Sequence, residues 1–243
     1  MIQVGIIGSG FIGPAHIEAL RRLGGVNVVA LCDSSLAVAQ ERADALHIPH
    51  AYGSVEALLA HPGLQVVHNC TPNYLHADIN RQILRAGLHV FSAKPLCMPP
   101  DEARELERLA QQVGVVHGVS FVYRQFAMVQ QAASMVRSGS VGRLFAVQGS
   151  YLQDWMLLET DYIWRVDAVQ GGNSRAIADI GSHWCDTVQF VTGKRIVEVM
   201  ADLAIVWPVR KASIASNATF GQQMADVQFE DKAVTTEDRG SVL

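Results

Sequence analysis

Three glycines near the start of the chain, Gly8, Gly10 and Gly13, constrain its fold more than any other feature. They follow a short apolar run, residues 3–7, that is typical of a strand buried on both faces. An amphipathic run over residues 11–23 comes next and predicts a helix. In such a unit the first glycine permits the turn, the second lets a pyrophosphate approach the backbone, and the third lets the helix pack against the strand. The helix N-terminus would then offer its N–H groups and partial positive charge to phosphates.

An acidic residue stands where such a unit binds a ribose. Residues 26–32 predict a second strand, and Asp33 follows it, about 20 residues after the last glycine. A carboxylate there can hydrogen-bond the 2′-hydroxyl of NAD and would repel the 2′-phosphate of NADP. The alternative is a glycine turn in an unrelated α/β protein, which is disfavoured because all parts of the motif are present. The residues expected to bind NAD here are Gly8, Gly10, Phe11, Ile12, Gly13, Asp33 and Ser34.

Strand and helix patterns alternate through the first half of the chain. Further strands are predicted at residues 64–70, 88–92 and 115–121. Further helices are predicted at residues 34–46, with Ser34 as the cap, and at residues 54–60, 74–86 and 99–113. Short connections between alternating elements predict a doubly wound parallel sheet. We therefore expect a dinucleotide-binding Rossmann domain over residues 1–120.

The second half has a different pattern and predicts an α+β domain with an open mixed sheet over residues 121–243. Its expected elements are helices at residues 126–138 and 179–191, strands at 142–152 and 196–207, a loop at 209–234 and a strand beginning at 235. An open sheet of about three strands leaves an unpaired edge. We therefore expect that the sequence stops short of its natural end or that a partner chain completes the sheet.

Composition excludes several classes of protein. Hydrophobic residues make up 49% of the chain and charged residues 17%, which favours a sizeable core over disorder. The net charge of −4 comes from interspersed charges, so neither nucleic acid nor an anionic membrane is an expected partner. No run approaches the roughly 20 apolar residues of a membrane span, and no signal segment is evident. Four widely spaced cysteines without a C-x-x-C motif predict reduced thiols in a cytoplasmic protein and no metal site.

Several further motifs resemble the Gfo/Idh/MocA family of oxidoreductases, which includes sugar and inositol dehydrogenases. The motifs are Thr71-Pro72-Asn73 with His76, Ala93-Lys94-Pro95, Tyr123-Arg124, Gly171-Gly172 and Asp179-Ile180-Gly181-Ser182-His183. The resemblance covers essentially the whole chain. It implies an NAD-dependent enzyme, with NADP less favoured, that moves a hydride between a secondary hydroxyl of a sugar, inositol or related polyol and the nicotinamide. It also implies a homo-oligomer, a dimer or tetramer, assembled through the C-terminal sheet.

The resemblance assigns the chemistry to three residues. The family's lysine in a Glu-Lys-Pro motif contacts the substrate hydroxyl and corresponds to Lys94, where a cation would lower the pKa of that hydroxyl. Here Ala93 replaces the glutamate, which removes a carboxylate beside the lysine. Asp179 and His183 lie four residues apart on an expected helix, so the imidazole could accept a hydroxyl proton while the carboxylate orients it. Taken alone, Lys94 could be a surface lysine, and the other two a pair on a helix surface.

Other positions follow the same resemblance. The nicotinamide half is expected beside Thr71, Pro72, Asn73, His76 and Lys94. The substrate is expected to contact Lys94, Tyr123, Arg124, Trp155, Arg165, Asp179 and His183, with Asp154 and Trp164 nearby. His76 could instead be a helix-surface histidine, and the aromatic residues could serve packing alone. Two other functions stay open: a non-catalytic NAD(H)-binding sensor, which Ala93 would suit, and an NAD-dependent enzyme that cleaves glycosides.

Overall fold

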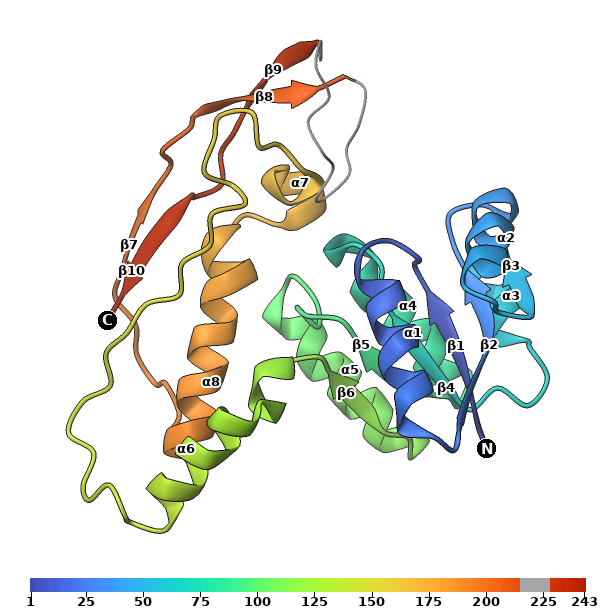
Figure 1. Ribbon diagram of the computed structural model, residues 1–243, viewed down its shortest axis with the longest axis horizontal. Helices are drawn as coiled ribbons and strands as arrows, with labels where there is room; N and C mark the ends of the chain where they lie inside the picture. The colour runs from blue at the N-terminus through green and yellow to red at the C-terminus, as the bar shows by residue number, and fades with distance from the viewer. Residues whose placement is uncertain (215–227) are drawn as a thin grey trace. The chain divides into compact units, whose positions relative to one another are not determined.

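The computed structural model describes residues 1–214 and 228–243 (Figure 1). The chain divides into two compact units, Met1–Ser120 and Phe121–Leu243. The first unit has the predicted doubly wound α/β fold, which is confirmed, and the second combines helices with strands. The open mixed sheet expected in the second unit is not formed by its described residues, whose strands pair only as two separate antiparallel pairs.

The first unit is built on a parallel sheet of six strands in the order β3-β2-β1-β4-β5-β6. The strands are β1 Ile2–Ile7, β2 Val26–Cys32, β3 His50–Tyr52, β4 Val66–Asn69, β5 His89–Ser92 and β6 His117–Val119. The helices are α1 Ile12–Leu23, α2 Leu36–Ala45, α3 Val55–Leu59, α4 His76–Arg85 and α5 Pro100–Val113. The order of the strands reverses at β1, which pairs with β2 on one side and β4 on the other. Open α/β sheets bind ligands at the carboxyl ends of strands at such a reversal.

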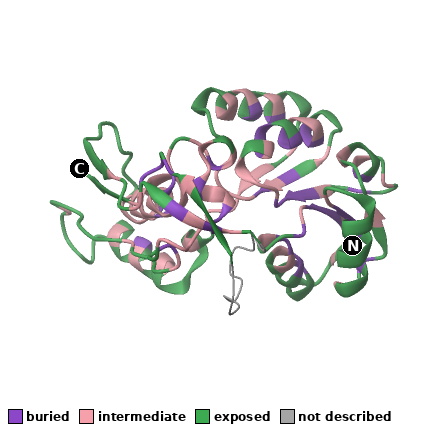
Figure 2. Cartoon of the chain, turned by 90° about the horizontal axis from the view of Figure 1, so that it is seen from above, coloured by how far each residue is buried: buried purple, intermediate pink, exposed green. Residues whose placement is uncertain are grey.

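The sheet is buried on both faces, as the apolar run in β1 predicts. Neighbouring residues of this strand, Ile6 and Ile7, are 0% and 2% exposed and belong to two different apolar clusters. Ile17 of α1 packs in the cluster of Ile6, and Leu106 of α5 packs in that of Ile7. Figure 2 shows buried residues along these strands. Burial on both faces fixes the carboxyl ends of the strands, where the site residues of this unit lie.

The cap of α2 differs from the prediction by one residue. The side chain of Ser35, not Ser34, accepts a hydrogen bond from the N–H of Val38 at 3.3 Å. Ser34 instead donates its backbone N–H to a carboxylate oxygen of Asp33 at 2.7 Å. The helix therefore begins one residue later because Ser34 is held in the turn that surrounds Asp33.

The second unit consists of three α-helices, shorter helical turns and two pairs of antiparallel strands within its described residues. The helices are α6 Ala127–Arg137, α7 Ala168–Gly171 and α8 Ser182–Thr192. The strands are β7 Ala201–Ala204, β8 Val209–Ser213, β9 Phe229–Ala233 and β10 Arg239–Val242. Strand β7 pairs with β10, and β8 pairs with β9.

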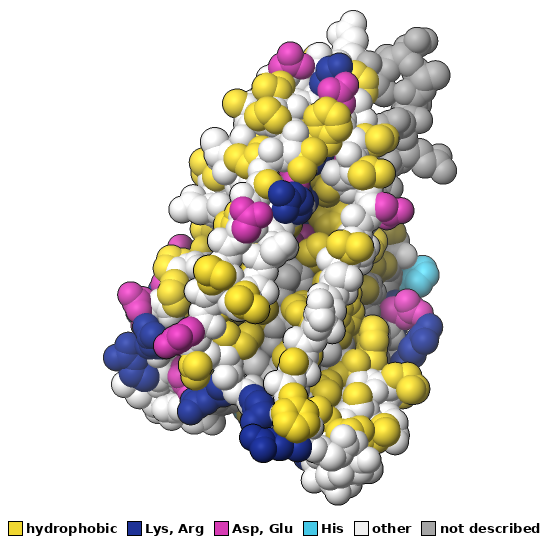
Figure 3. All heavy atoms as spheres, turned by 90° about the vertical axis from the view of Figure 1, so that its left-hand side faces the viewer, with side chains coloured by type: hydrophobic (Ala, Val, Ile, Leu, Met, Phe, Trp, Pro, Cys, Tyr) yellow, Lys and Arg dark blue, Asp and Glu magenta, His cyan; other side chains and the backbone are white. Residues whose placement is uncertain are grey.

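Three predictions for this half were wrong. Residues 142–152 form no strand, and of residues 196–207 only β7 is a strand. The expected loop at 209–234 contains β8 and β9, and its residues 215–227 lie outside the described part of the chain. Alternation produces a strand only where a neighbour completes the hydrogen-bond ladder, and the described residues provide no such neighbour for 142–152. Apolar side chains of residues 142–152, such as Phe145 and Leu152, stay exposed. Figure 3 shows apolar side chains spread over the face in view.

Candidate active site

The glycine turn joins the carboxyl ends of three strands. Gly8 has a φ of +92°, a conformation that side chains disfavour, and a Cβ there would lie 2.7 Å from the carbonyl oxygen of Cys70 after β4. Its N–H also donates to the carbonyl of Cys32, the last residue of β2, at 2.9 Å. Glycine at position 8 therefore lets the backbone turn at the point where the order of the strands reverses.

The other two glycines of the motif have different surroundings. A Cβ at Gly13 would lie 2.3 Å from the carbonyl oxygen of Gly8, so a bare backbone is required for α1 to approach the turn. A Cβ at Gly10 would meet nothing within 4 Å. The N-cap residue of α1 is Phe11, whose side chain has no hydrogen-bond acceptor to cap the helix, and the first turn has no acidic residue. Open space beside a helix N-terminus of this kind fits a pyrophosphate.

Exchanging each glycine for alanine separates these two roles. Gly13→Ala is expected to lower the free energy of unfolding by about 1–3 kcal/mol, because the added methyl group overlaps the backbone of Gly8. Gly10→Ala is the matched control, with an unchanged Tm but a higher Kd for NAD. Thermal unfolding and NAD titration of both variants check this, and equal Tm values for Gly13→Ala and the wild type would contradict it.

Asp33 ends β2 as a carboxylate that is held in place. Its Oδ2 accepts hydrogen bonds from the backbone N–H of Ser9, at 2.8 Å, and from the Ser9 hydroxyl. Its Oδ1 accepts the N–H of Ser34 at 2.7 Å. Burial raises the pKa of Asp33, but the hydrogen bonds from Ser9 and Ser34 outweigh it and hold the pKa below its usual value. The carboxylate is therefore ionised at neutral pH. The role of Ser9 was missed, although its place between two glycines of the motif was visible.

His76 is buried within the first unit rather than exposed on the surface of a helix. Its ring is 1% exposed, with Nδ1 against the carbonyl oxygen of Pro95 and Nε2 2.7 Å from that of Thr71. Burial lowers the pKa of His76, although both carbonyl contacts raise it. The buried ring therefore has a structural role within the first unit, and its contact with the nicotinamide stays a prediction. The ring connects the segment of Thr71 to the segment that contains Lys94.

The segments of Thr71 and Lys94 follow neighbouring strands. The carboxyl ends of β4 and β5 are adjacent, with Asn69 opposite Ser92. The Thr71 hydroxyl donates to Oδ1 of Asn69 at 2.7 Å, and the N–H of Ala93 donates to the Asn69 carbonyl at 2.8 Å. Thr71, Pro72, Asn73 and Lys94 are partly exposed at this edge. The buried Asn69, which sequence reasoning missed, therefore anchors both segments.

In the second unit, Asp179 and His183 lie on successive helical segments. Asp179 belongs to a π-helical turn, Ile177–Gly181, and His183 to the first turn of α8. The prediction of one regular helix was therefore incomplete. The extra residue in the turn changes the angular offset between the two side chains from that of an α-helix, and π turns are frequent at functional sites.

Aromatic rings surround His183, which is 8% exposed. Its ring centroid lies 4.5 Å from that of Tyr123 and 5.6 Å from that of Phe121. The hydroxyl groups of Tyr123 and Tyr151 share a hydrogen bond. Burial, this hydrogen bond and the charge of Asp179 raise the pKa of Tyr123 to about 12, so its phenol stays protonated at neutral pH. A cavity of about 210 Å³ lies beside His183, and its lining includes Tyr123, Tyr151 and Trp184 of α8.

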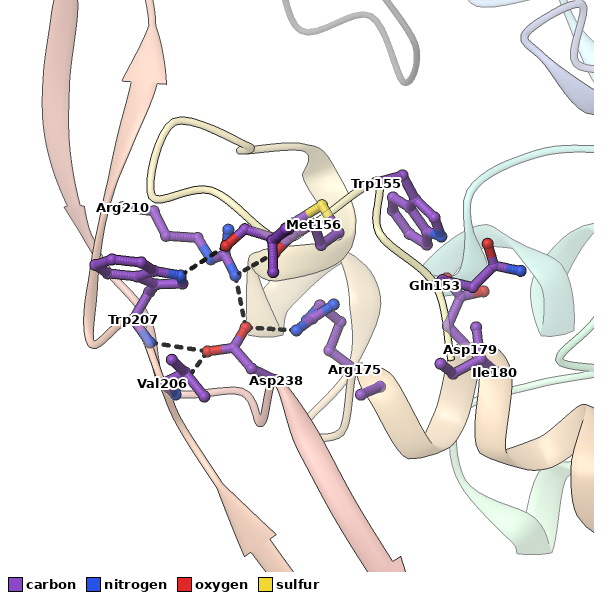
Figure 4. A pocket seen from close by; sticks show the side chains of 12 residues that line it. Gln153, Trp155, Met156, Arg175, Asp179, Ile180, Val206, Trp207, Arg210 and Asp238 are labelled. Atoms are coloured by element: carbon purple, nitrogen blue, oxygen red, sulfur yellow. Dashed lines mark hydrogen bonds and ion pairs between the residues drawn. The ribbon is translucent and has the colours of Figure 1, made fainter. Parts of the chain in front are cut away.

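A second cavity, of about 160 Å³, lies beside Asp179. Figure 4 shows Gln153, Trp155 and Asp179 on one side of it and the arginines around Asp238 on the other. Asp179 also pairs with Arg165, whose Nε lies 3.6 Å from Oδ2 of Asp179. The structure thus brings the predicted Trp155 and Arg165 close to Asp179, and the predicted Tyr123 close to His183.

Arg124 forms an ion pair within the second unit. Its guanidinium forms a two-point ion pair with Asp186 of α8, with Nε 2.8 Å from Oδ2. Asp186 is 8% exposed, so the pair holds the segment after Phe121 against the helix that carries His183. The ion pair uses Nε and Nη2 of Arg124, and contact of this side chain with a substrate stays a prediction.

The described residues contain no cluster of three or more His, Cys, Asp or Glu side chains that could hold a metal ion. Over residues 1–214 and 228–243, no helix has the length and apolar character of a membrane span.

Comparison with known proteins agrees with this arrangement of motifs. The oxidoreductase family with an NAD-binding Rossmann fold, GFO_IDH_MocA, matches residues 2–121, and the GFO/IDH/MocA C-terminal domain matches residues 129–241. The chain belongs to the Gfo/Idh/MocA family. The resemblance inferred from the motifs is thereby confirmed, as is the NAD-binding class of the first unit.

Relatives within the Gfo/Idh/MocA family include named sugar dehydrogenases. The chain is 29% identical over 204 residues to the levoglucosan dehydrogenase of Pseudarthrobacter phenanthrenivorans, which covers 79% of this chain and 52% of that protein. It is 29% identical over 198 residues to the D-glucoside 3-dehydrogenase of Escherichia coli, covering 79% and 54%. The structure of a levoglucosan dehydrogenase in complex with NADH and L-sorbose matches with a TM-score of 0.87 at 25% identity, covering 100% of this chain and 63% of that one. The chain thus spans about half to two thirds of the length of these relatives.

Proposed function

We propose that this Gfo/Idh/MocA protein is an NAD-dependent dehydrogenase that oxidises a secondary hydroxyl of a sugar, inositol or related polyol. The observation that carries the proposal is the glycine turn, where open space at Gly10 and the ionised carboxylate of Asp33 suit NAD. The named activities of relatives that act on levoglucosan and on D-glucosides favour a sugar substrate.

The first unit would hold the cofactor. Gly8, Gly10 and Gly13, with the N-terminus of α1, would bind the pyrophosphate, and Asp33 would bind the adenosine ribose. Thr71 and Asn73, at the carboxyl edge of β4, would lie beside the nicotinamide ring. When bound, NAD supplies the hydride chemistry.

Three side chains would act on the substrate hydroxyl. His183 would accept the proton of the substrate hydroxyl, and Asp179 would orient the imidazole. Lys94 would bind the same oxygen and stabilise the negative charge that develops on it. Tyr123, which stays protonated at neutral pH, can donate a hydrogen bond to the substrate beside His183.

Asp33 predicts which cofactor is preferred. Asp33→Asn is expected to reduce the ratio of the Kd for NADP to the Kd for NAD by at least about tenfold, because it removes the charge that repels a 2′-phosphate. Fluorescence titration of both cofactors checks this, with Asp44→Asn, on the exposed side of α2, as the control. An unchanged ratio in Asp33→Asn would mean that Asp33 does not face the ribose.

An absorbance assay for NADH, with a panel of sugars and inositols, tests the dehydrogenase directly. We expect NADH to form with at least one sugar or inositol of the panel. NAD binding without turnover on any member of the panel would favour the second candidate, a non-catalytic sensor, to which Ala93 in place of the motif glutamate points. A product other than a ketone, with no net NADH, would indicate glycoside cleavage through transient oxidation.

We also propose that the whole protein forms a homo-oligomer through its C-terminal part. The second unit supports this with exposed apolar side chains, among them Phe145, Leu152, Val197 and Met200. Light scattering of the intact protein measures its mass.

A further inference from the structure

A distant carboxylate binds the start of the helical segment that carries both proposed catalytic side chains of the second unit. Ala176, at the N-cap, offers no side-chain hydrogen bond. Glu237, between β9 and β10, accepts instead, with Oε1 bound by the N–H groups of Arg175, at 3.0 Å, and Ile177, at 2.9 Å. The Ser174 hydroxyl donates to the same oxygen at 2.8 Å. One carboxylate therefore binds three donors at the start of this segment.

The residues on either side of Glu237 bind other parts of the same unit. The Thr236 hydroxyl donates to the carbonyl of Val166 at 3.1 Å. The carboxylate of Asp238 lies between the guanidinium groups of Arg175 and Arg210 (Figure 4). Asp238 also accepts hydrogen bonds from the backbone ahead of β8. Three consecutive side chains thus bind three segments that are separate in the sequence: the turn that contains Val166, the turn that contains Ile177 and the strand that contains Arg210.

The contacts of Thr236 and Glu237 connect the two turns that carry Arg165 and Asp179. Thr236 holds the turn next to Arg165, while Glu237 holds the turn that contains Asp179, and Nε of Arg165 lies 3.6 Å from Oδ2 of Asp179. We propose that Glu237 is a positioning residue for catalysis, which fixes the π-helical turn so that Asp179 is correctly oriented. The proposal rests on the dehydrogenase function proposed above.

The charge of Glu237 is essential to this role. The side chain is 5% exposed, so its burial is unfavourable unless hydrogen bonds and the partial positive charge of the helix N-terminus offset it. Glu237→Gln keeps the shape and one acceptor oxygen. It places an NH₂ group where Oε2 now accepts the N–H of Arg175 at 3.1 Å. The substitution therefore loosens the turn without creating a cavity.

Glu237→Gln in the intact protein is expected to lower kcat by about ten- to a hundredfold, because small misplacements of catalytic groups have effects of this size. The Kd for NAD should stay unchanged, since Glu237 lies outside the first unit. Glu230→Gln, the same exchange on the exposed strand β9, is the matched control and should leave both constants unchanged. An unchanged kcat in Glu237→Gln, with a lowered Tm, would overturn the proposal and leave only a structural role.

A double-mutant cycle with Asp179→Asn separates positioning from general stability. If Glu237 acts through Asp179, adding Glu237→Gln to Asp179→Asn should lower kcat by less than threefold further, and additive losses would overturn the proposal. Should Glu237→Gln fail to fold, Ser174→Ala removes one donor and should show a smaller loss with the same non-additivity.

Amide hydrogen exchange of the peptide that contains Ile177 needs no turnover. Faster exchange in Glu237→Gln than in the wild type supports the anchoring of the turn, and equal exchange overturns it. Absence of turnover by the wild type would count against the dehydrogenase function, while the exchange measurement would still decide whether Glu237 fixes the turn.

Discussion

Replacing His183 with asparagine is expected to lower kcat by about 10²- to 10⁴-fold, the usual contribution of a positioned general base. Asparagine can occupy much of the same space among the aromatic rings but cannot accept the hydroxyl proton. The Kd for NAD should change little, because the residues proposed to bind the dinucleotide belong to the first unit. Steady-state kinetics and NAD titration of the same preparation measure the two effects.

The matched control for this variant is His47→Asn. His47 is exposed at the end of α2 and has a φ of +53°, which asparagine tolerates well. It should keep the wild-type kcat and Tm. If His183→Asn lost NAD binding and turnover equally, or lost neither, His183 would not be the proton acceptor.

Replacing Lys94 with methionine is expected to lower kcat/KM by about 10²- to 10³-fold, as for other donors that stabilise charge on a reacting oxygen. Methionine keeps the length of the side chain and removes the charge. Lys94→Arg should recover only part of the loss, because a planar guanidinium does not reproduce the geometry of an ammonium group.

Lys194→Met is the control, because Lys194 is exposed beyond the end of α8 and is not one of the proposed site residues. It should retain wild-type kinetics. If Lys94→Met left kcat/KM within a few-fold of the wild type, Lys94 would be an ordinary surface lysine, which is the alternative that the sequence alone leaves open.

The first unit could be predicted well because its signals are local. The apolar run of β1, the glycine spacing and the carboxylate at Asp33 each follow from neighbouring residues, and the structure places them around one turn. The error at Ser34 was of one residue, because two successive serines can both cap a helix, and the turn around Asp33 decides between them.

The second unit could be predicted less well because its determining contacts are distant in sequence. Residues 142–152 alternate like a strand, yet a strand also needs a neighbour for its hydrogen bonds. No local pattern indicates that Glu237 binds the N–H groups of Arg175 and Ile177, some 60 residues earlier. The burial of His76 could not be predicted for a similar reason, since the carbonyl of Pro95 that contacts it follows another strand.

Transfer of deuterium tests the proposed reaction most directly. A sugar from the substrate panel, labelled with deuterium on the carbon that bears the reacting hydroxyl, would be incubated with the protein and NAD, and the reduced cofactor analysed by mass spectrometry. Direct hydride transfer predicts NADH that carries the label, formed in equal amount to the ketone. Reduced cofactor without the label, or a ketone formed without any reduced cofactor, would contradict it.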